Sequence, residues 1–320
     1  MIELADFFHY GTIAAVVGFN SLGVGIGEGL TSSAAVEAIN LQPEAKYDIS
    51  RTAILGMALI ETAAIMGITI AFILLLGSTG TTYTLCNGIA DLGIAFAISF
   101  SGLAIGIASS LSAREACMAI ARQPFFAQRI LRFMLLTLSI NQTPIVFAFL
   151  VAIFINAQAS QCTAIINGLR LLATGLSVGI GSIGPAIGLA LFSGTAIQGL
   201  GINRKSYNKL LSFTLISNAI IETPIIFALL TSLILLFVAD GTSTDMVKGI
   251  AWVSAALCMG MGTIGVGISS GRTAAAACHQ IAKNPEYHSI LSRTSMFAQG
   301  LIDTFAIYAL LIAIILILLP

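Results

Sequence analysis

The sequence predicts an all-α membrane protein of eight transmembrane helices, arranged as four tandem, parallel helical hairpins. Of its 320 residues, 57% are hydrophobic and only 9% are charged, whereas a soluble domain usually has about 25% charged residues. The apolar residues form long runs, such as 54–76 and 304–319, and about 20 predominantly apolar residues span the hydrocarbon core of a bilayer. The sequence does not show the short alternating segments that are typical of a β-barrel.

The hairpins follow from a repeat, which is marked by a polar residue inside every second apolar run. These four site residues are each followed by Thr and recur at nearly constant intervals along the chain: Glu61, Gln142, Glu222 and Asp303. Nineteen positions before them lie Gln42, Gln123, Asn203 and Asn284, followed by Pro43, Pro124, Arg204 and Pro285. The period predicts hairpins over 1–80, 81–160, 161–241 and 242–320, with helices near 8–33, 52–77, 88–113, 131–156, 168–198, 210–237, 249–274 and 294–319.

Charge and composition restrict orientation and function. Twelve of the 14 basic residues lie in or beside the loops within hairpins, which predicts cytoplasmic hairpin loops and both termini outside. The net charge of zero implies no nucleic-acid partner, and we find no nucleophile constellation, metal cluster or phosphate loop that indicates an enzyme. The five cysteines lack CxxC spacing, and we interpret them as small buried hydrophobic residues.

The first helix of each hairpin is rich in small residues. Pairs four residues apart, such as Gly23/Gly27 and Gly102/Gly106, share a helix face and allow backbones to approach closely. Small residues extend around much of each first helix, which favours a tightly packed inner ring of first helices.

The carboxylates of Glu61, Glu222 and Asp303 lie about ten residues inside their predicted spans, where a charge costs about 2.5–3.5 kcal/mol on insertion scales. Burial favours their protonated form when no cation is near, so each acid suits reversible ion binding. The alternative is a structural acid that a neighbouring hydroxyl satisfies, but three acids in register favour the ion carrier. The chain has no Lys or Arg at mid-membrane, since Arg170 lies near the outer end of its span.

The first hairpin carries the motif "GVGIGEGLTSSAAVEAINLQPEAKYDISRTAILGMALIETAAI". Its Gly-rich helix, Gln-Pro loop and second-helix Glu resemble the c subunit (proteolipid) of rotary F-type ATP synthases, and the likeness recurs in all four hairpins as a fused form. The resemblance implies a ring of several chains in a bacterial-type inner membrane, without a cofactor. The ring would turn against a stator subunit with an essential Arg (the a subunit of the family).

The resemblance also implies that the hairpin loops contact the central stalk. The residues that correspond are Gln42, Pro43, Arg122, Gln123, Pro124, Lys283, Asn284 and Pro285. The third loop departs as "INRKSY", which puts its stalk contact in doubt.

The transported ion is predicted from the position thirty-three places before each site residue, where sodium-binding relatives have a polar ligand. Here it holds Glu28, Ser109, Leu189 and Ser270. Glu28 with Glu61 and Thr62 resembles a sodium site, whereas Leu189 offers no ligand, so we expect protons and keep Na⁺ as an alternative. The candidate co-ligands are Glu28, Thr62, Thr223, Thr304 and Ser270.

Gln142 cannot titrate, so each chain is expected to carry three ions per four hairpins. Fewer ions per ATP favour hydrolysis-driven pumping, as in the vacuolar-type proteolipids, which also fuse hairpins and lack some carboxylates. The alternative is that Gln142 is merely tolerated. Two other classes remain: a self-contained transporter built from parallel repeats, and a purely structural proteolipid.

Overall fold

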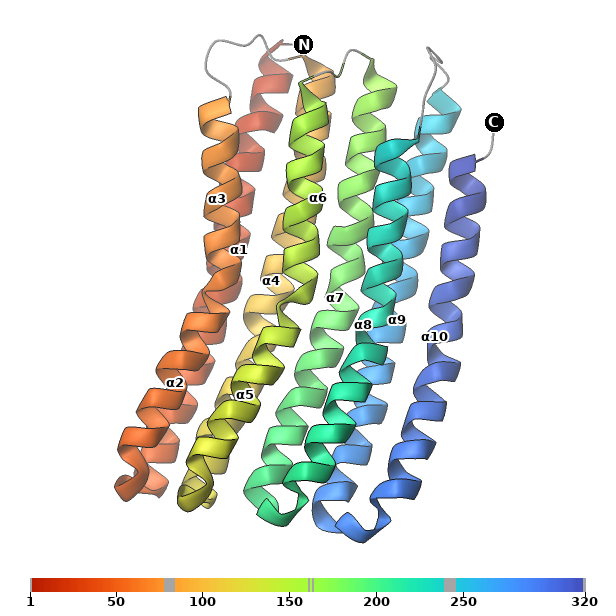
Figure 1. Ribbon diagram of the computed structural model, residues 1–320. Helices are drawn as coiled ribbons and strands as arrows, with labels where there is room; N and C mark the ends of the chain where they lie inside the picture. The colour runs from red at the N-terminus through yellow and green to blue at the C-terminus, as the bar shows by residue number, and fades with distance from the viewer. Residues whose placement is uncertain (1, 78–83, 161, 163, 239–245, 319–320) are drawn as a thin grey trace.

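The computed structural model describes residues 2–77, 84–160, 162, 164–238 and 246–318, and regular structure in these segments is entirely helical. Eight helical segments in this part of the chain are long and apolar enough to cross a bilayer, as predicted. They run side by side, and α1 begins at the same end of the bundle at which α10 ends, opposite the four hairpin turns (Figure 1). The protein is therefore an integral membrane protein made of four tandem hairpins.

The first helices are α1 (Ile2–Leu41), α4 (Leu85–Arg122), α7 (Ile165–Ile202) and α9 (Met246–Lys283). The second helices of hairpins 1 and 2 are each divided at the site residue, into α2 (Lys46–Ile60) and α3 (Thr62–Gly77), and α5 (Ala127–Asn141) and α6 (Thr143–Ala159). Those of hairpins 3 and 4 are the continuous helices α8 (Tyr207–Phe237) and α10 (His288–Leu318).

The predicted helix bounds were too short. The helix α4 has 38 residues, which corresponds to about 57 Å at 1.5 Å per residue, against a hydrocarbon core of about 30 Å. Hydropathy marks only the part of a helix that lies in lipid. Alanine-rich sequence continues α4 past that limit to Arg122, because alanine is the strongest helix former.

Each hairpin closes with a single turn of 3₁₀ helix: η1 (Pro43–Ala45), η2 (Pro124–Phe126), η3 (Arg204–Ser206) and η4 (Pro285–Tyr287). Proline suits the first position of such a turn because its φ is fixed and the missing N–H would have no helical partner. The third turn begins with Arg204 instead. There the side chain of Asn203 accepts a hydrogen bond from the Lys205 N–H at 3.1 Å, so the turn forms without proline.

The helices form two layers. The first helices pack in chain order, α1 on α4, α4 on α7 and α7 on α9. Each of the first three second helices lies over the groove between its own first helix and the next one, while α10 lies at the edge on α9 and α8. The most buried helix is α7, and the most exposed are α1 and α10. A single chain therefore has two open edges.

Glycine sets the close spacing of the inner layer. A Cβ added at Gly27 would collide with the carbonyl oxygen of Gly106, and one added at Gly188 would collide with the carbonyl oxygen of Gly267. The predicted small-residue contacts thus occur between first helices, at α1–α4 and again at α7–α9.

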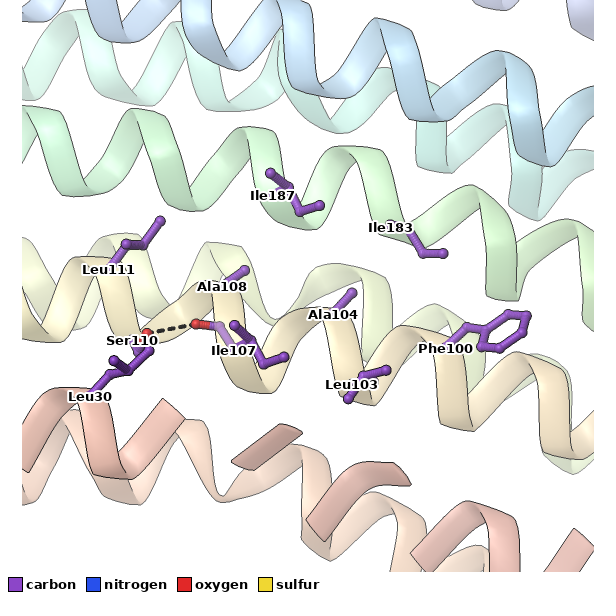
Figure 2. Close-up of a pocket in the computed structure, with 10 residues that line it drawn as sticks. All are labelled: Leu30, Phe100, Leu103, Ala104, Ile107, Ala108, Ser110, Leu111, Ile183 and Ile187. Carbon is purple, nitrogen blue, oxygen red and sulfur yellow. Dashed lines mark hydrogen bonds between the residues drawn. The ribbon is translucent and has the colours of Figure 1, made fainter. Parts of the chain in front are cut away.

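The interface between α4 and α7 is glycine-packed towards the chain termini, where a Cβ added at Gly175 would collide with the carbonyl oxygen of Gly93, but it differs nearer the hairpin turns. Ala104 and Ala108 stand there in the register that Gly23 and Gly27 hold in hairpin 1. An apolar cavity of about 360 Å³ opens beside these alanines, lined by Leu30 of α1 and by residues of α4 and α7 (Figure 2). Where alanine replaces glycine in this interface, the helices therefore leave a cavity beside them.

Candidate functional site

The four site residues occupy equivalent places on the second helices. Glu61 lies between α2 and α3, Gln142 between α5 and α6, and Glu222 and Asp303 lie within α8 and α10. Each is more than ten residues from either end of its span. The repeat therefore brings four polar side chains to one level of the outer layer.

Their surroundings differ. Glu61 is exposed at the open edge, Glu222 is half-buried, and Gln142 and Asp303 are buried. Among the described residues, Oε1 of Glu222 and Oδ1 of Asp303 are buried and have no hydrogen-bond partner. A carboxyl oxygen without a partner among the described residues is available to bind an ion or a proton.

Gln142, in contrast, is held by hydrogen bonds from two hairpins. The Thr62 hydroxyl donates to Oε1 of Gln142 at 3.0 Å, and Nε2 of Gln142 donates to Oγ of Ser109 at 3.4 Å. Beside it, Asn141 donates to Ser112 at 3.4 Å and accepts from Ser193 of α7 at 3.2 Å. The second hairpin thus replaces an acid by an amide network that links α3, α4, α5 and α7.

The threonine after each site residue turns back onto its own helix. The single hydroxyl hydrogen of Thr62 is shared between the Leu59 carbonyl at 2.7 Å and Oε1 of Gln142, and Thr304 donates to the carbonyl of Leu301 at 2.6 Å. Thr223 donates to the carbonyl of Ala219 at 3.2 Å. None of these bonds reaches the acid of the same hairpin.

A threonine instead lies beside the site residue of the following hairpin. Thr62 contacts Gln142, and the hydroxyl of Thr143 lies next to the carboxyl of Glu222. The sequence did not single out Thr143, since no pattern within one hairpin places it near Glu222. Pro144 explains part of its geometry: proline lacks an N–H, and Thr143 donates to the Ile140 carbonyl at 2.7 Å, four residues before the proline.

The co-ligand positions thirty-three places upstream lie on the first helices. Glu28 is close enough to Glu61 for their charges to repel each other. Leu189 is fully buried, and Ser270 is fully buried with an unpartnered Oγ in the described structure. The four candidate sites therefore offer four different sets of ligands, and His, Cys, Asp and Glu form no metal-binding group in the described residues.

The hairpin turns place the predicted stalk-contact residues together at one end of the bundle (Figure 1). Between the second and third turns lies a groove of about 500 Å³ lined by Phe125, Phe126, Gln128, Arg129, Arg204 and Lys205. The Arg129 guanidinium lies 5.4 Å from the Phe126 ring centre. The unusual third turn therefore contributes two cations to this groove.

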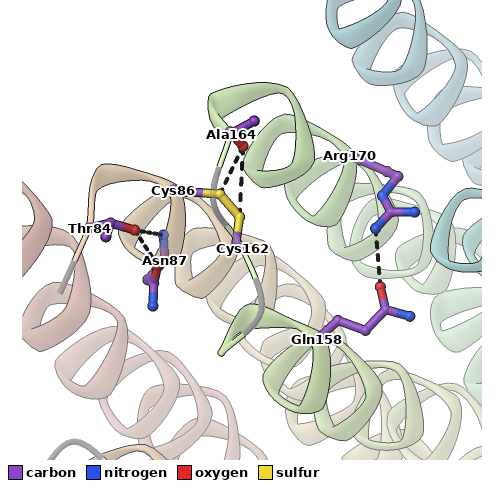
Figure 3. The surroundings of a disulfide bond; sticks show 7 residues. All are labelled: Thr84, Cys86, Asn87, Gln158, Cys162, Ala164 and Arg170. Atoms are coloured by element: carbon purple, nitrogen blue, oxygen red, sulfur yellow. Dashed lines mark hydrogen bonds between the residues drawn. A yellow bond between two sulfur atoms is a disulfide. The ribbon is translucent and has the colours of Figure 1, made fainter. Parts of the chain in front are cut away.

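The interpretation of the cysteines as small buried residues was wrong for two of them, because they are paired. Cys86 at the start of α4 and Cys162 between α6 and α7 form a disulfide with Cα atoms 5.8 Å apart (Figure 3), although they are 76 residues apart in the chain. Spacing alone could not reveal this pair, because the fold brings it together. Cys117, Cys258 and Cys278 are free.

Arg170 lies near the disulfide, at the end of the bundle opposite the hairpin turns. Its guanidinium donates to the Val238 carbonyl at 2.7 Å and to Oε1 of Gln158 at 3.3 Å (Figure 3). A second polar contact at this end joins α1 and α4, where Nδ1 of His9 is 2.7 Å from Oδ2 of the buried Asp91. Both lie far from the level of the site residues.

Repeated membrane hairpins, a glycine-packed inner layer and an acid at one level of the outer layer define a proteolipid of the rotary ATPase class. The family model for the C subunit of ATP synthase matches residues 12–74, 172–235 and 253–316, more than half of the chain. The chain belongs to this family. The three matched segments are hairpins 1, 3 and 4, which carry Glu61, Glu222 and Asp303.

Individual relatives are single c subunits of ATP synthases, each about one hairpin of this chain. The second such subunit of Cereibacter sphaeroides is 48% identical over 68 residues, covering 21% of this chain and 82% of the relative. The c subunit of Bacillus thuringiensis is 42% identical over 67 residues, covering 20% and 93%. That of Dehalococcoides mccartyi is 38% identical over 71 residues, covering 22% and 93%.

Proposed function

We propose that the chain is the ion-carrying rotor subunit of a rotary ATP synthase or ATPase, in which Glu61, Glu222 and Asp303 each bind one ion reversibly. The observation that carries the proposal is the common level of the three acids on the outer layer. A rotor requires this arrangement, since every carrier must pass the same point of a stator. The stator then supplies the cation that the chain lacks at mid-membrane, as the essential Arg of the a subunit does in the family.

Protons are the proposed cargo. A sodium ion needs several oxygen ligands, and the surroundings of Glu222 provide the Thr143 hydroxyl while Leu189 fills the upstream position. Because one rotor uses the same ion at all its sites, the site with the fewest sodium ligands, that of Glu222, determines which ion the rotor carries. The Glu28–Glu61 pair with Thr62 keeps Na⁺ as the alternative, with Thr223, Thr304 and Ser270 as further co-ligands.

Because Gln142 cannot titrate, the second hairpin binds no ion at its site position. The amide of Gln142 is held by Thr62 and Ser109, which supports a settled structural role and not a vacant site. Each chain then carries three ions past the stator per four hairpins, and the complex gains driving force per ion during ATP-driven pumping.

Ring formation is supported by the open edges of the chain. Gly25 and Gly29 of hairpin 1 occupy the repeat positions that Gly106 and Ser110 occupy in hairpin 2. A Cβ added at Gly25 or at Gly29 would meet nothing within 4 Å. Gly265 on α9, in the register of Gly23, is equally open. These two faces are the halves of the interface that α7 and α9 already form, so a second copy of the chain completes them head to tail.

The proposed orientation rests on the two ends of the bundle. Basic residues gather at the hairpin turns, and the Cys86–Cys162 disulfide lies at the other end. Disulfides persist in oxidising compartments, and positive loops stay cytoplasmic. We infer that the hairpin turns are cytoplasmic and face the central stalk, that both termini lie outside, and that the protein is in an inner membrane. The ATP chemistry would belong to partner subunits. The four hairpin units are residues 1–80, 81–160, 161–241 and 242–320.

Carbodiimide labelling tests the proposal, because this reagent attacks protonated carboxyls that are reachable from lipid. The membrane-extracted protein is labelled with and without Na⁺ and mapped by mass spectrometry. Labelling of all three acids without protection by Na⁺ is the expected result. Protection by Na⁺ would move the cargo to sodium, and absence of label at all three acids would contradict the carrier. A chain that transports ions alone as a monomer would support the self-contained transporter.

A further inference from the structure

Hairpins 3 and 4 carry polar side chains on the turn side of their acids, where hairpins 1 and 2 are apolar. Four residues before the site residue lie Asn218 and Gln299, against Met57 and Leu138. Eight residues before it lie Thr214 and Ser295, against Ala53 and Met134. Residues four apart share a helix face, so α8 and α10 each present a polar stripe on the turn side of the acid.

The stripe on α10 runs from the middle of the membrane to the hairpin turn. It consists of Asp303, Gln299, Ser295, Ser292 and His288, at helical spacings of three and four residues. The first four side chains are at most 9% exposed, and Nε2 of His288 is buried. The stripe therefore faces the interior, in the wedge between α8, α9 and α10.

Many buried polar atoms on α8, α9 and α10 have no hydrogen-bond partner among the described residues. Nine such buried atoms are Oγ1 of Thr214, both amide atoms of Asn218, Oε1 of Glu222, Oγ of Ser270, Nε2 of His288, Oγ of Ser292, Oε1 of Gln299 and Oδ1 of Asp303. The described parts of α2, α3, α5 and α6 have none. A buried polar group left unpaired is destabilising, and buried polar atoms in native proteins are paired with protein or ordered water.

Direct bonds satisfy only part of this wedge. Nε2 of Gln299 donates to Ser295 at 3.0 Å and across to Ser217 of α8 at 3.4 Å. Ser295 donates to the Thr273 carbonyl of α9 at 3.4 Å. These bonds tie the three helices together, while the remaining donors and acceptors of the same side chains need small polar partners.

We propose that the wedge between α8, α9 and α10 binds a chain of ordered water molecules that extends from Asp303 to His288. A buried water typically makes about three hydrogen bonds to otherwise unsatisfied groups, and hydroxyls, amides and a carboxyl supply donors and acceptors along the whole stripe. Resting on the proposed function, the consequence is a hydrated path for protons between Asp303 and the turn side, inside the rotor itself. Glu61 has no such path, because Met57 and Ala53 occupy the equivalent positions.

Two cysteines are matched probes for this water. Cys117 and Cys278 each lie twenty-five places before the site residue of their hairpin, and both are fully buried. Cys278 lies beside Thr214 of α8. Cys117 lies on α4 of hairpin 2, and α2 packs on this helix. The position on α2 that corresponds to Thr214 is occupied by the apolar Ala53.

The test is X-ray radiolysis of the intact protein in ¹⁸O-labelled water, which generates hydroxyl radicals from bound water in place. Oxidation of Cys278 several-fold faster than that of Cys117, with uptake of ¹⁸O, is expected. Equal, background oxidation of both cysteines would overturn the proposal. The readout does not depend on ion transport, so it separates failure of the water chain from failure of the rotor function.

Two variants test the cause. Asn218→Leu and Gln299→Met introduce the residues that hairpins 2 and 1 already use at this register, so the fold has precedents for both. We expect them to reduce oxidation of Cys278 to the level of Cys117, with folding checked by the unchanged rate at Cys117. Oxidation of Cys278 that persists in the double variant would also overturn the assignment of the water to this stripe.

Discussion

The hydroxyl of Thr62 donates a hydrogen bond to Oε1 of Gln142 across 3.0 Å, joining the first hairpin to the second at the level of the site residues. Thr143 stands in the same relation to Glu222 one hairpin later. In hairpins 2 and 3, a threonine of the preceding hairpin thus lies at the polar site. In the proposed ring, the hairpin before Glu61 would belong to another copy of the chain and would offer Thr304.

Removing this hydroxyl tests the contact. Thr62→Val leaves the buried Oε1 of Gln142 without its donor, and we expect a loss of about 1–3 kcal/mol in the free energy of unfolding. Thr69→Val is the matched control, since its exposed hydroxyl bonds only to the carbonyl of Ile65 on the same helix. The measurement is denaturant unfolding of the detergent-solubilised protein. Equal stability of both variants would show that the contact contributes nothing.

Restoring an acid in the second hairpin should add a carrier. In Gln142→Glu, Thr62 can still donate to a carboxyl oxygen, and Ser109 can donate in place of accepting. We expect carbodiimide labelling at residue 142 and a rise from three to four labelled acids per chain. In the assembled complex, the number of ions moved per ATP should rise by one third. An unlabelled residue 142 would show that this position is closed to carriers.

Neutralising an existing acid should do the reverse. Glu222→Gln and Asp303→Asn each remove one titrating group while keeping its size, and Gln142 shows that the fold accepts an amide at this level. We expect coupled ion transport to be lost or strongly reduced while the chain still assembles. Glu115→Gln, an acid away from this level on α4, is the control and should transport normally. Normal transport by either site variant would remove that acid from the carrier set.

The close glycine contacts between first helices lead to a prediction about stability. An alanine Cβ at Gly188 would meet the carbonyl of Gly267, and overpacking typically costs about 1–3 kcal/mol. Gly18→Ala adds a Cβ that meets nothing within 4 Å, so helix propensity should stabilise this variant by up to about 1 kcal/mol. Thermal unfolding of the two variants measures the difference. A Gly188→Ala variant as stable as Gly18→Ala would mean that the helices can separate without cost.

The disulfide predicts a thiol count. In denaturant without reductant, Cys117, Cys258 and Cys278 should react with a thiol reagent, and all five cysteines should react after reduction. Cys162→Ala should free Cys86 and remove the link between the two hairpins at this end. Five reactive thiols before reduction would contradict the disulfide in the membrane of origin.

The repeat in the sequence was enough to predict the hairpins and the level of the acids, because lipid penalises a polar residue inside an apolar span and its recurrence in register therefore indicates a shared site. Helix ends were missed because hydropathy reports where lipid ends and not where hydrogen bonding ends. The Thr143–Glu222 and Cys86–Cys162 pairs were missed for a different reason. Each joins two hairpins, and a repeat describes what each hairpin contains but not which face it turns to its neighbour.

The water-binding stripe has a signal in the sequence that does not by itself define a site. Asn218 and Gln299 stand in register with Met57 and Leu138, and that difference between copies is as clear as the one at Gln142. Its meaning depends on burial, since the same residues on a lipid-facing or solvent-facing surface would need no partners. Only the packing of α8, α9 and α10 makes it a site.

The open glycine faces on α1 and α9 have a numerical consequence. In the ring proposed above, whole chains join head to tail through these faces, so the number of hairpins would be a multiple of four. The hairpins without an acid would then recur at every fourth place, evenly around the circumference. Fusion of the hairpins in one polypeptide would therefore fix the order in which hairpins with and without an acid pass the stator. In a ring assembled from separate single hairpins of two kinds, this order would be random.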